Sequence, residues 1–530
     1  MREEMNAAER PVLLDGVWDF AFTETVEAAP EYAECAAVPG CFDAAGLHYP
    51  QQGCGWYRRR VRAEGDLRLE IGSFGMRLAA FWDGEKLGES SFAWSPAVFE
   101  FTAGPGEHEL VLRADNIVSG HPLFRPNYDF YAFGGIFDHV KLARRAPDEI
   151  RYLAVLPLDH TTGLVEIRVE TDAPTLTLAF DDGPAETVPA AAVLRRNVPD
   201  LRVWSPETPH LHRLTVNGKT VTFGIRTLDW SGPQLLLNGR EIKLLGVNRH
   251  ESHPEFGPAT PESLIASDLL QLKRAGFNFV RGSHYPQREF LFDFCDRIGM
   301  LVWEEPLAWG NPAADLADPV FSGSLLAQNE LTVRRSINHP SLVIHGFLNE
   351  CASDTEEGKA LISRLVEQCH KLDPTRPATF ACNHVDTDIS LELCDIAAVN
   401  VYPAWYGPQT VAEIPDFLLG LARKHAGKPV IVSEIGAAAI LGDHSGNRWS
   451  EEYQAEVCTQ ALRCVAEHSE FTGVALWLYC NANTYITGRD ALMRPRGFNN
   501  KGLLDEYRRP KAAWHALSRL IAELKEKHHA

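Results

Sequence analysis

From about residue 227 onward, short apolar runs alternate with longer segments of helical periodicity, and few folds accommodate that order. Eight runs have the length and composition of buried strands: 242–247, 277–281, 300–303, 342–348, 378–380, 396–399, 430–432 and 474–477. The clearest helical segments between them are 263–274, 288–298, 358–372 and 455–467. Parallel strands require crossover connections, usually helices, and eight strand–helix units close into a (β/α)8 barrel. The sequence therefore predicts a TIM barrel over residues 227–530, with no predicted conformation for the loops that follow the strands.

The preceding residues have the pattern of antiparallel β structure. Runs such as 67–71 and 108–113 alternate apolar and polar side chains, and turn-forming clusters such as 103–106 separate them. We expect a jelly-roll β-sandwich over residues 1–147 and a shorter, immunoglobulin-like β-sandwich over residues 148–226. The fold class is therefore multidomain, because 530 residues are too many for one hydrophobic core.

Charge and composition argue against several classes of partner. A formal net charge of −20 disfavours nucleic acid, which needs a basic surface. No stretch approaches the ~20 apolar residues of a membrane span, and the N-terminal residues lack the apolar core of a signal peptide. The 11 Cys have no CxxC spacing, which favours free thiols in a reducing cytoplasm. We expect a cytoplasmic protein without a nucleic-acid or membrane partner, and a homo-oligomer remains open.

Two glutamates close apolar runs that we expect to be buried strands. Glu350 ends the run that begins at Ser341, and Glu434 lies in the run that begins at Pro429. Burying a carboxylate without a partner costs several kcal/mol, so these positions need an explanation. The carboxyl ends of barrel strands converge on the face where catalytic groups collect. Two carboxyl groups about 5 Å apart could cleave a glycosidic bond with retention, one protonating the leaving oxygen and the other attacking the anomeric carbon.

The sequence around Glu350 belongs to a larger set of motifs. His339-Pro340-Ser341 is followed by an apolar run that ends in Asn349-Glu350. Further motifs occur at residues 14–20, 53–59, 203–211 and 237–251, so they extend over nearly the whole chain. In these motifs the chain resembles glycoside hydrolase family 2, which contains the β-galactosidases, β-glucuronidases and β-mannosidases. The resemblance implies a retaining exo-β-glycosidase that works through a covalent glycosyl-enzyme.

Residue by residue, the resemblance implies roles for the side chains around this pair. Glu350 would be the general acid/base, Glu434 the nucleophile, and Asn349 would hold the sugar 2-hydroxyl. Tyr402 would donate a hydrogen bond to Glu434 and lower the pKa of that carboxyl. A tyrosine that merely packs in the core is the alternative for Tyr402.

The resemblance also implies that further side chains surround the sugar. These are His250, His284, Trp477, Tyr406 and Asp129. Trp477 would offer a flat apolar face to the sugar ring, and Asp129 would reach the site from the first domain. Core histidines with satisfied hydrogen bonds are the alternative interpretation of His250 and His284.

The run from Trp303 to Trp309 argues against a catalytic metal. The comparable stretch of bacterial β-galactosidases has an acidic residue followed two positions later by a histidine, and this run contains no histidine. His250 and His253 are three positions apart, whereas a zinc-binding helix needs histidines four apart. We therefore expect neither a metal nor a cofactor.

Asn499 and Lys501 bear on the identity of the sugar. They resemble the Asn-x-Lys triplet that grips the sugar carboxylate in β-glucuronidases, and a neutral sugar would leave the ammonium uncompensated. We expect a β-glucuronidase that acts on a small glycoside or an oligosaccharide end. A β-galacturonidase and a β-galactosidase are alternatives, because some members with Asn-x-Lys-Gly act on neutral sugars. A non-catalytic carbohydrate-binding protein is the alternative from a different class.

Overall fold

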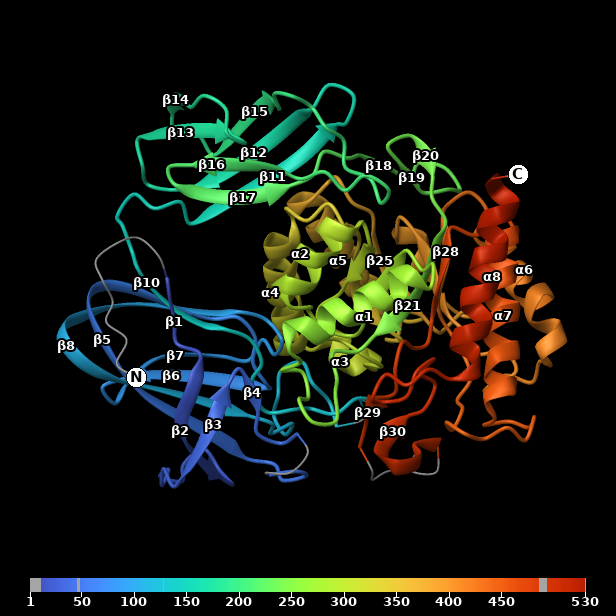
Figure 1. Ribbon diagram of the computed structural model, residues 1–530, viewed down its shortest axis with the longest axis horizontal. Coiled ribbons are helices and arrows are strands. Elements are labelled where there is room, and N and C mark those ends of the chain that lie inside the picture. Colours follow the sequence, from blue (N-terminus) through green and yellow to red (C-terminus); the bar gives the residue numbers. More distant parts are fainter. Residues whose placement is uncertain (1–10, 45–47, 127, 486–492, 530) are drawn as a thin grey trace. The chain divides into compact units, whose positions relative to one another are not determined.

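The computed structural model divides the chain into two compact units (Figure 1). It describes residues 11–44, 48–126, 128–485 and 493–529. One unit comprises Met1–Glu149 and Glu251–Pro261, and the other comprises Ile150–His250 and Glu262–Ala530. The second β region thus shares a unit with the barrel, and the domain boundaries near residues 147 and 226 stay predictions.

The first unit is built on one eight-stranded antiparallel sheet. Six strands follow the order β1-β10-β5-β8-β6-β7, while β2 pairs with β3 and β5. Their bounds are β1 Val12–Leu13, β2 Gly16–Thr23, β3 Glu34–Val38, β5 Cys54–Ile71, β6 Arg77–Trp82, β7 Glu85–Ser90, β8 Ala97–Asp115 and β10 Val140–Arg144; β4 Gly40–Cys41 pairs separately with β9 Gly135–Ile136. In β5 the side chains of Leu67, Leu69 and Ile71 are buried at every second position, as the period-two pattern predicts.

The second β region consists of a three-stranded and a four-stranded antiparallel sheet. The first contains β11 Tyr152–Asp159, β12 Leu164–Glu170 and β15 Val193–Asn197, and the second contains β13 Thr175–Phe180, β14 Glu186–Pro189, β16 His212–Val216 and β17 Lys219–Phe223. Val155 and Ile167 from one sheet pack with Leu176 and Leu214 from the other in a single core. Two sheets that share a core in this way form a sandwich.

The C-terminal region is a closed parallel barrel of eight strands, β21 to β28 (Figure 1). The strands are β21 Leu244–Arg249, β22 Phe279–Gly282, β23 Leu301–Glu304, β24 Leu342–Asn349, β25 Ala378–Cys382, β26 Ala397–Asn400, β27 Val430–Ile435 and β28 Gly473–Leu476. The helices are α1 Glu262–Arg274, α2 Glu289–Ile298, α3 Ala313–Ala317, α4 Pro319–Ser336, α5 Glu356–Leu372, α6 Ile414–Lys424, α7 Glu451–Glu467 and α8 Ala512–His529. Short elements accompany them: β18 Leu228–Asp229, β19 Leu236–Leu237, β20 Arg240–Glu241, η1 Leu391–Leu393, η2 Val411–Glu413, β29 Ala482–Asn483, η4 Pro495–Gly497 and β30 Phe498–Asn499. The predicted fold class is confirmed, because each of the eight predicted strand runs overlaps a barrel strand.

The interior of the barrel is filled by side chains from neighbouring strands. Trp303 of β23 is fully buried there, and Gly346 of β24 makes room for it: a Cβ at Gly346 would lie 2.0 Å from Nε1 of Trp303. The guanidinium of Arg281 lies over the Trp303 ring, 4.9 Å from the ring centroid. The core of the barrel thus supports a charged side chain of β22. None of the described helices combines the length and the apolar character that crossing a membrane requires.

Candidate active site

The two glutamates lie at the carboxyl ends of two barrel strands, β24 and β27. Glu350 directly follows β24, and Glu434 is the penultimate residue of β27. Glu434 is buried and Glu350 is half-buried. The backbone of Glu350 has a φ of 52°, a left-handed conformation that costs a non-glycine residue roughly 1–2 kcal/mol. Such strain concentrates at functional sites, because the surrounding structure must enforce it.

Arg281 ties the two strand ends together from the end of β22. Its Nη1 donates to Oε1 of Glu434 at 2.8 Å, and its Nη2 donates to Oδ1 of Asn349 at 2.8 Å. Arg281 also forms an ion pair with Glu305 at 3.0 Å, so the fully buried guanidinium faces two carboxylates. Burial raises the pKa of Glu305 to about 7, although Arg281 opposes that shift. The arrangement places one fixed positive charge beside Glu434.

Asn400, the last residue of β26, connects the second glutamate to the same network. Its Nδ2 donates to Oε1 of Glu350 at 2.9 Å and to Oδ1 of Asn349 at 3.0 Å. Among the described residues, nothing accepts a hydrogen bond from Nδ2 of Asn349, although this atom is buried. A buried donor without a protein acceptor is suited to a ligand hydroxyl, because it would otherwise remain unsatisfied.

Tyr402 contacts Glu434, as expected from the sequence. Its Oη donates to Oε2 of Glu434 at 2.7 Å. Burial raises the pKa of the Tyr402 phenol well above its usual value, and the neighbouring Glu434 and Glu350 raise it further. The phenol therefore stays protonated and remains a hydrogen-bond donor to the carboxylate at neutral pH.

The structure brings His250, His284 and Trp477 together beside Glu434. Nε2 of His284 lies 3.8 Å from Oε1 of Glu434, and its Nδ1 lies 2.8 Å from Oε1 of Glu305. The rings of His284 and Trp477 stack with centroids 5.1 Å apart, and His250 meets Trp477 edge-on at 5.3 Å. One face of the Trp477 ring is thus covered by a histidine, and stacking of the ring on a sugar stays a prediction.

The remaining predicted residues of the barrel form a cationic corner. Nζ of Lys501 donates to Oη of Tyr406 at 2.7 Å and lies 5.4 Å from the centroid of the Tyr402 ring. Asn499, in β30, accepts a hydrogen bond from the backbone N–H of Lys501 at 3.4 Å. Burial raises the pKa of the Tyr406 phenol, but the positive charges of Lys501 and Arg494 outweigh it and lower that pKa. Tyr402 therefore links Glu434 to this corner, since it contacts both.

Asp129 belongs to the first unit, so its expected reach into the barrel site stays a prediction. Arg281, Glu305 and Asn400 were missed at the level of the sequence. Each lies in or directly after an apolar strand, which is the same signal that drew attention to Glu350 and Glu434. Applied to every strand end, that signal would have found them.

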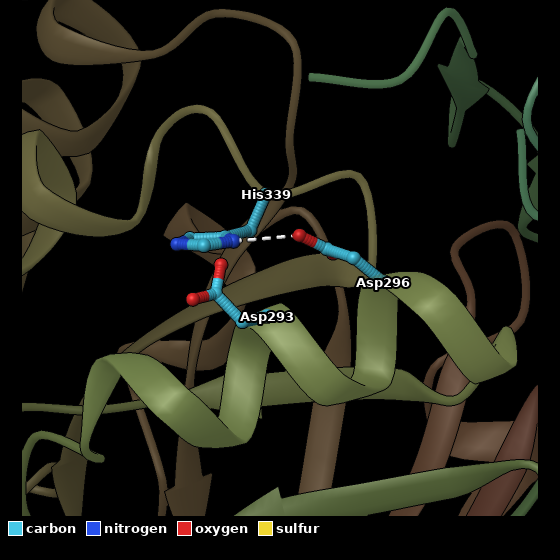
Figure 2. A group of neighbouring side chains, drawn as sticks. All are labelled: Asp293, Asp296 and His339. Atoms are coloured by element: carbon cyan, nitrogen blue, oxygen red, sulfur yellow. Dashed lines mark hydrogen bonds and ion pairs between the residues drawn. The ribbon is translucent and has the colours of Figure 1, made fainter. Parts of the chain in front are cut away.

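Figure 2 shows the one group of metal-type ligands that occurs among the described residues. It contains Asp293 and Asp296 of α2 and His339, which precedes β24 and so lies at the opposite end of that strand from Glu350. Nδ1 of His339 lies 2.6 Å from Oδ2 of Asp296, and Oδ1 of Asp296 accepts from the backbone N–H of Ser341. Burial lowers the pKa of His339, but Asp296 outweighs this effect and raises it. The pair therefore satisfies itself as an ion pair that anchors the start of β24. The expected absence of a catalytic metal stays a prediction.

Comparisons with known proteins identify the family to which the barrel belongs. Residues 230–525 match the family model described as "Glycosyl hydrolases family 2, TIM barrel domain". The β-glucuronidase of Canis lupus familiaris is 28% identical over 78% of this chain and 67% of its own length, and that of Streptococcus agalactiae is 26% identical over 94% of both chains. Among solved structures, a β-galacturonidase of the family from Eisenbergiella tayi, bound to galacturonate, superposes with a TM-score of 0.89 and 31% identity over 97% of both chains. A β-glucuronidase from Faecalibacterium prausnitzii superposes with a TM-score of 0.88 and 27% identity over 99% of both.

Proposed function

The chain belongs to glycoside hydrolase family 2 and is a glycosidase, and we propose that it is a retaining exo-β-glycosidase that releases terminal β-linked uronic acids, with β-glucuronides as its substrates. We propose likewise the covalent mechanism, the roles of the site residues and the choice of sugar. A small glycoside or the end of an oligosaccharide would supply the sugar.

The observation that carries the choice of sugar is the cationic corner beside Glu434. Lys501 is 2% exposed, and its ammonium lies within reach of two tyrosine rings and one phenol oxygen. An ammonium in such a place interacts most strongly with a carboxylate, because charge-assisted hydrogen bonds are about twice as strong as neutral ones. A neutral sugar would offer this ammonium no charge-assisted hydrogen bond.

The proposed reaction begins with attack by Glu434 on the anomeric carbon. The phenol of Tyr402 and the guanidinium of Arg281 each donate to one oxygen of Glu434 and hold the carboxylate in place. Glu350, held by Asn400, would protonate the leaving oxygen as the glycosidic bond breaks. Once the glycosyl-enzyme has formed, the negative charge of Glu434 is gone, so Glu350 ionises more readily and can activate a water molecule.

The proposal is tested with a panel of 4-nitrophenyl β-glycosides: the glucuronide, the galacturonide, the galactoside and the glucoside. We expect the glucuronide to have the highest kcat/KM. Glu434→Gln should abolish turnover of every substrate, because the amide cannot form the covalent intermediate. A Glu434→Gln variant that hydrolyses as fast as the unaltered chain would refute the catalytic proposal and favour a carbohydrate-binding protein.

The carboxylate role has its own test. Lys501→Ala should abolish turnover of the glucuronide while leaving any residual turnover of the galactoside. Equal losses on both substrates, or no loss on either, would refute that role. The galactoside serves as the internal control, since it requires the same two glutamates but carries no carboxylate.

A β-galacturonidase is the second candidate. The structures from Eisenbergiella tayi, described as a β-galacturonidase, are 31% identical to this chain over 97% of its length. Galacturonate differs from glucuronate only in the configuration of the 4-hydroxyl, and Lys501 could bind the carboxylate of either. The relative kcat/KM for the two 4-nitrophenyl uronides decides between them.

The expected location also remains a proposal. All eleven cysteines are free thiols, which supports the cytoplasm or another reducing compartment. A homo-oligomer and the lack of a nucleic-acid partner stay predictions, and size-exclusion chromatography with light scattering would test the first of them.

A further inference from the structure

Lys511 is a fully buried lysine that the proposed reaction does not use. It lies directly before α8, and its Nζ donates three hydrogen bonds. The acceptors are the carbonyl oxygen of Ala439 at 2.8 Å, the carbonyl oxygen of Asn500 at 2.9 Å and Oδ1 of Asn481 at 3.0 Å. An ammonium has three N–H groups, so the three acceptors match its full donor capacity.

The three acceptors belong to three different loops at the carboxyl end of the barrel. Ala439 follows β27, the strand of Glu434, and Asn481 follows β28. Asn500 directly precedes Lys501, and its carbonyl oxygen also accepts from the backbone N–H of Ala439 at 3.1 Å. Through these hydrogen bonds, Lys511 connects the loop of Lys501 to the loops that follow the last two barrel strands.

A second buried side chain holds the same loop. Nε2 of Gln454, on α7, donates to the carbonyl oxygens of Lys501 and Gly502 at 3.1 Å and to that of Ala437 at 2.9 Å. The backbone of Lys501 is thus held on one side by Gln454 and Lys511, while its ammonium reaches Tyr406. The backbone that carries the Lys501 side chain is therefore hydrogen-bonded by a side chain of α7 and by the residue before α8.

We propose that Lys511 is a positioning residue for recognition of the sugar carboxylate: by holding the carbonyl of Asn500 against Ala439 and Asn481, it keeps Lys501 within reach of the carboxylate. The inference rests on the proposed uronidase function. Removal of the ammonium leaves three oxygens of these loops without their donor, and the loops must then move or admit water to satisfy them.

The surroundings of Lys511 predict that its three hydrogen bonds depend on pH. The ionisable groups that interact electrostatically with it include Glu451 and Cys458 of α7, Asp505 and Glu506 of the segment before α8, and Arg496 of η4. Burial lowers the pKa of Lys511 to about 7, against the raising effect of the carboxylates. The neutral amine has two N–H groups, so one of the three hydrogen bonds is lost as the pH rises through this range.

The test compares two lysine-to-methionine variants. Lys511→Met removes the three hydrogen bonds of the ammonium. Lys243→Met removes a half-buried lysine that directly precedes β21 and donates to the carbonyl oxygens of His468 and Phe471. Both variants lose a lysine that bonds backbone carbonyls, but only the first lies beside Lys501. The measurements are KM and kcat for the 4-nitrophenyl uronide that the unaltered chain prefers, together with the midpoint of thermal unfolding.

We expect Lys511→Met to raise KM about tenfold or more, with a smaller change in kcat, because a misplaced binding group weakens binding before it alters the bond-breaking groups. Lys243→Met should leave KM unchanged even if it lowers the unfolding midpoint. In the unaltered chain KM should rise between about pH 6 and about pH 8, and this rise should be absent in Lys511→Met.

Several outcomes would overturn the inference. An unchanged KM in Lys511→Met, or an equal rise of KM in both variants, would reduce Lys511 to a general stabilising residue. Should Lys511→Met fail to fold, Asn481→Leu, which removes one of the three acceptors, decides by the same KM measurement. If the unaltered chain hydrolyses no uronide, the proposed function itself is wrong; if it does and KM does not respond, only the role of Lys511 is wrong.

Discussion

Replacing Gly346 by alanine should disturb the active site from inside the barrel. The added Cβ would lie 2.0 Å from Nε1 and 2.9 Å from Cε2 of Trp303. Trp303 is fully buried, so its indole can shift only if neighbouring side chains also move. Overpacking of this kind typically costs 1–3 kcal/mol, and we expect a destabilisation of about that size.

The same change should lower activity, because Trp303 supports Arg281. The guanidinium lies 4.9 Å from the centroid of the Trp303 ring, and its Nη1 donates to Glu434 at 2.8 Å. A displaced indole therefore displaces the cation beside Glu434. Misplacement of a positioning group by about 1 Å can cost about 10²-fold in rate, so we expect kcat/KM to fall by between about 10-fold and about 100-fold.

Gly420→Ala is the matched control. Gly420 is an exposed residue within α6, and a Cβ there would meet no atom within 4 Å. Alanine favours a helix interior by roughly 1 kcal/mol over glycine, so this variant should be slightly more stable and equally active. The assays are thermal unfolding followed by tryptophan fluorescence, and kcat/KM on a 4-nitrophenyl uronide. A Gly346→Ala variant with normal stability would refute the packing argument, and one with reduced stability but normal kcat/KM would refute the coupling to Arg281.

Three further predictions follow from individual contacts. Tyr402→Phe removes a 2.7 Å hydrogen bond to Glu434, and since hydrogen bonds to charged groups are worth about 1.5–3 kcal/mol, kcat/KM should fall by roughly 10- to 100-fold; a smaller fall than threefold would make Tyr402 a packing residue. Arg281→Met leaves the buried carboxylates of Glu434 and Glu305 without their cation and should destabilise the chain by about 3–5 kcal/mol, measured by urea denaturation. Adding Glu305→Gln to this variant should restore part of the stability but no activity. Burial raises the pKa of Asp43 in the first unit to about 6, so the folded state binds more protons than the unfolded state between about pH 4 and about pH 6. Stability should therefore fall as the pH rises through this window. Asp43→Asn should remove that part of the pH dependence of the urea midpoint.

The amino-acid sequence was sufficient to predict where the strands of the barrel lie along the chain. Apolar runs bounded by helical segments located all eight strands of the barrel, because a strand buried on both faces must be apolar along its length. α4 shows where this signal weakens: no helix was predicted at residues 319–336. The structure begins that helix at Pro319, where Asp318 accepts from the backbone N–H of Val320 at 3.0 Å. A capping aspartate and a proline in the first turn are themselves recognisable start signals.

The candidate site was partly visible in the same way. Glu350, Glu434 and Tyr402 stand in motifs that a single chain displays, and the predicted contact between Tyr402 and Glu434 is present. Arg281 was missed because its partners are 68 and 153 positions away, and nothing local indicates which strand ends will face each other. The same holds for Lys511, whose carbonyl acceptor at Ala439 is 72 positions distant.

Sequence alone was thus sufficient for the order of the barrel strands and for the acidic pair, because both depend on residues that are neighbours along the chain. Closure of the barrel decided the rest. It brought the ends of β22, β24, β26 and β27 together around Arg281 and Asn400, and it placed Lys501 beside Tyr402. Those contacts depend on strand register and on side chains that meet across the barrel, and such distances are set only when the last strand pairs with the first.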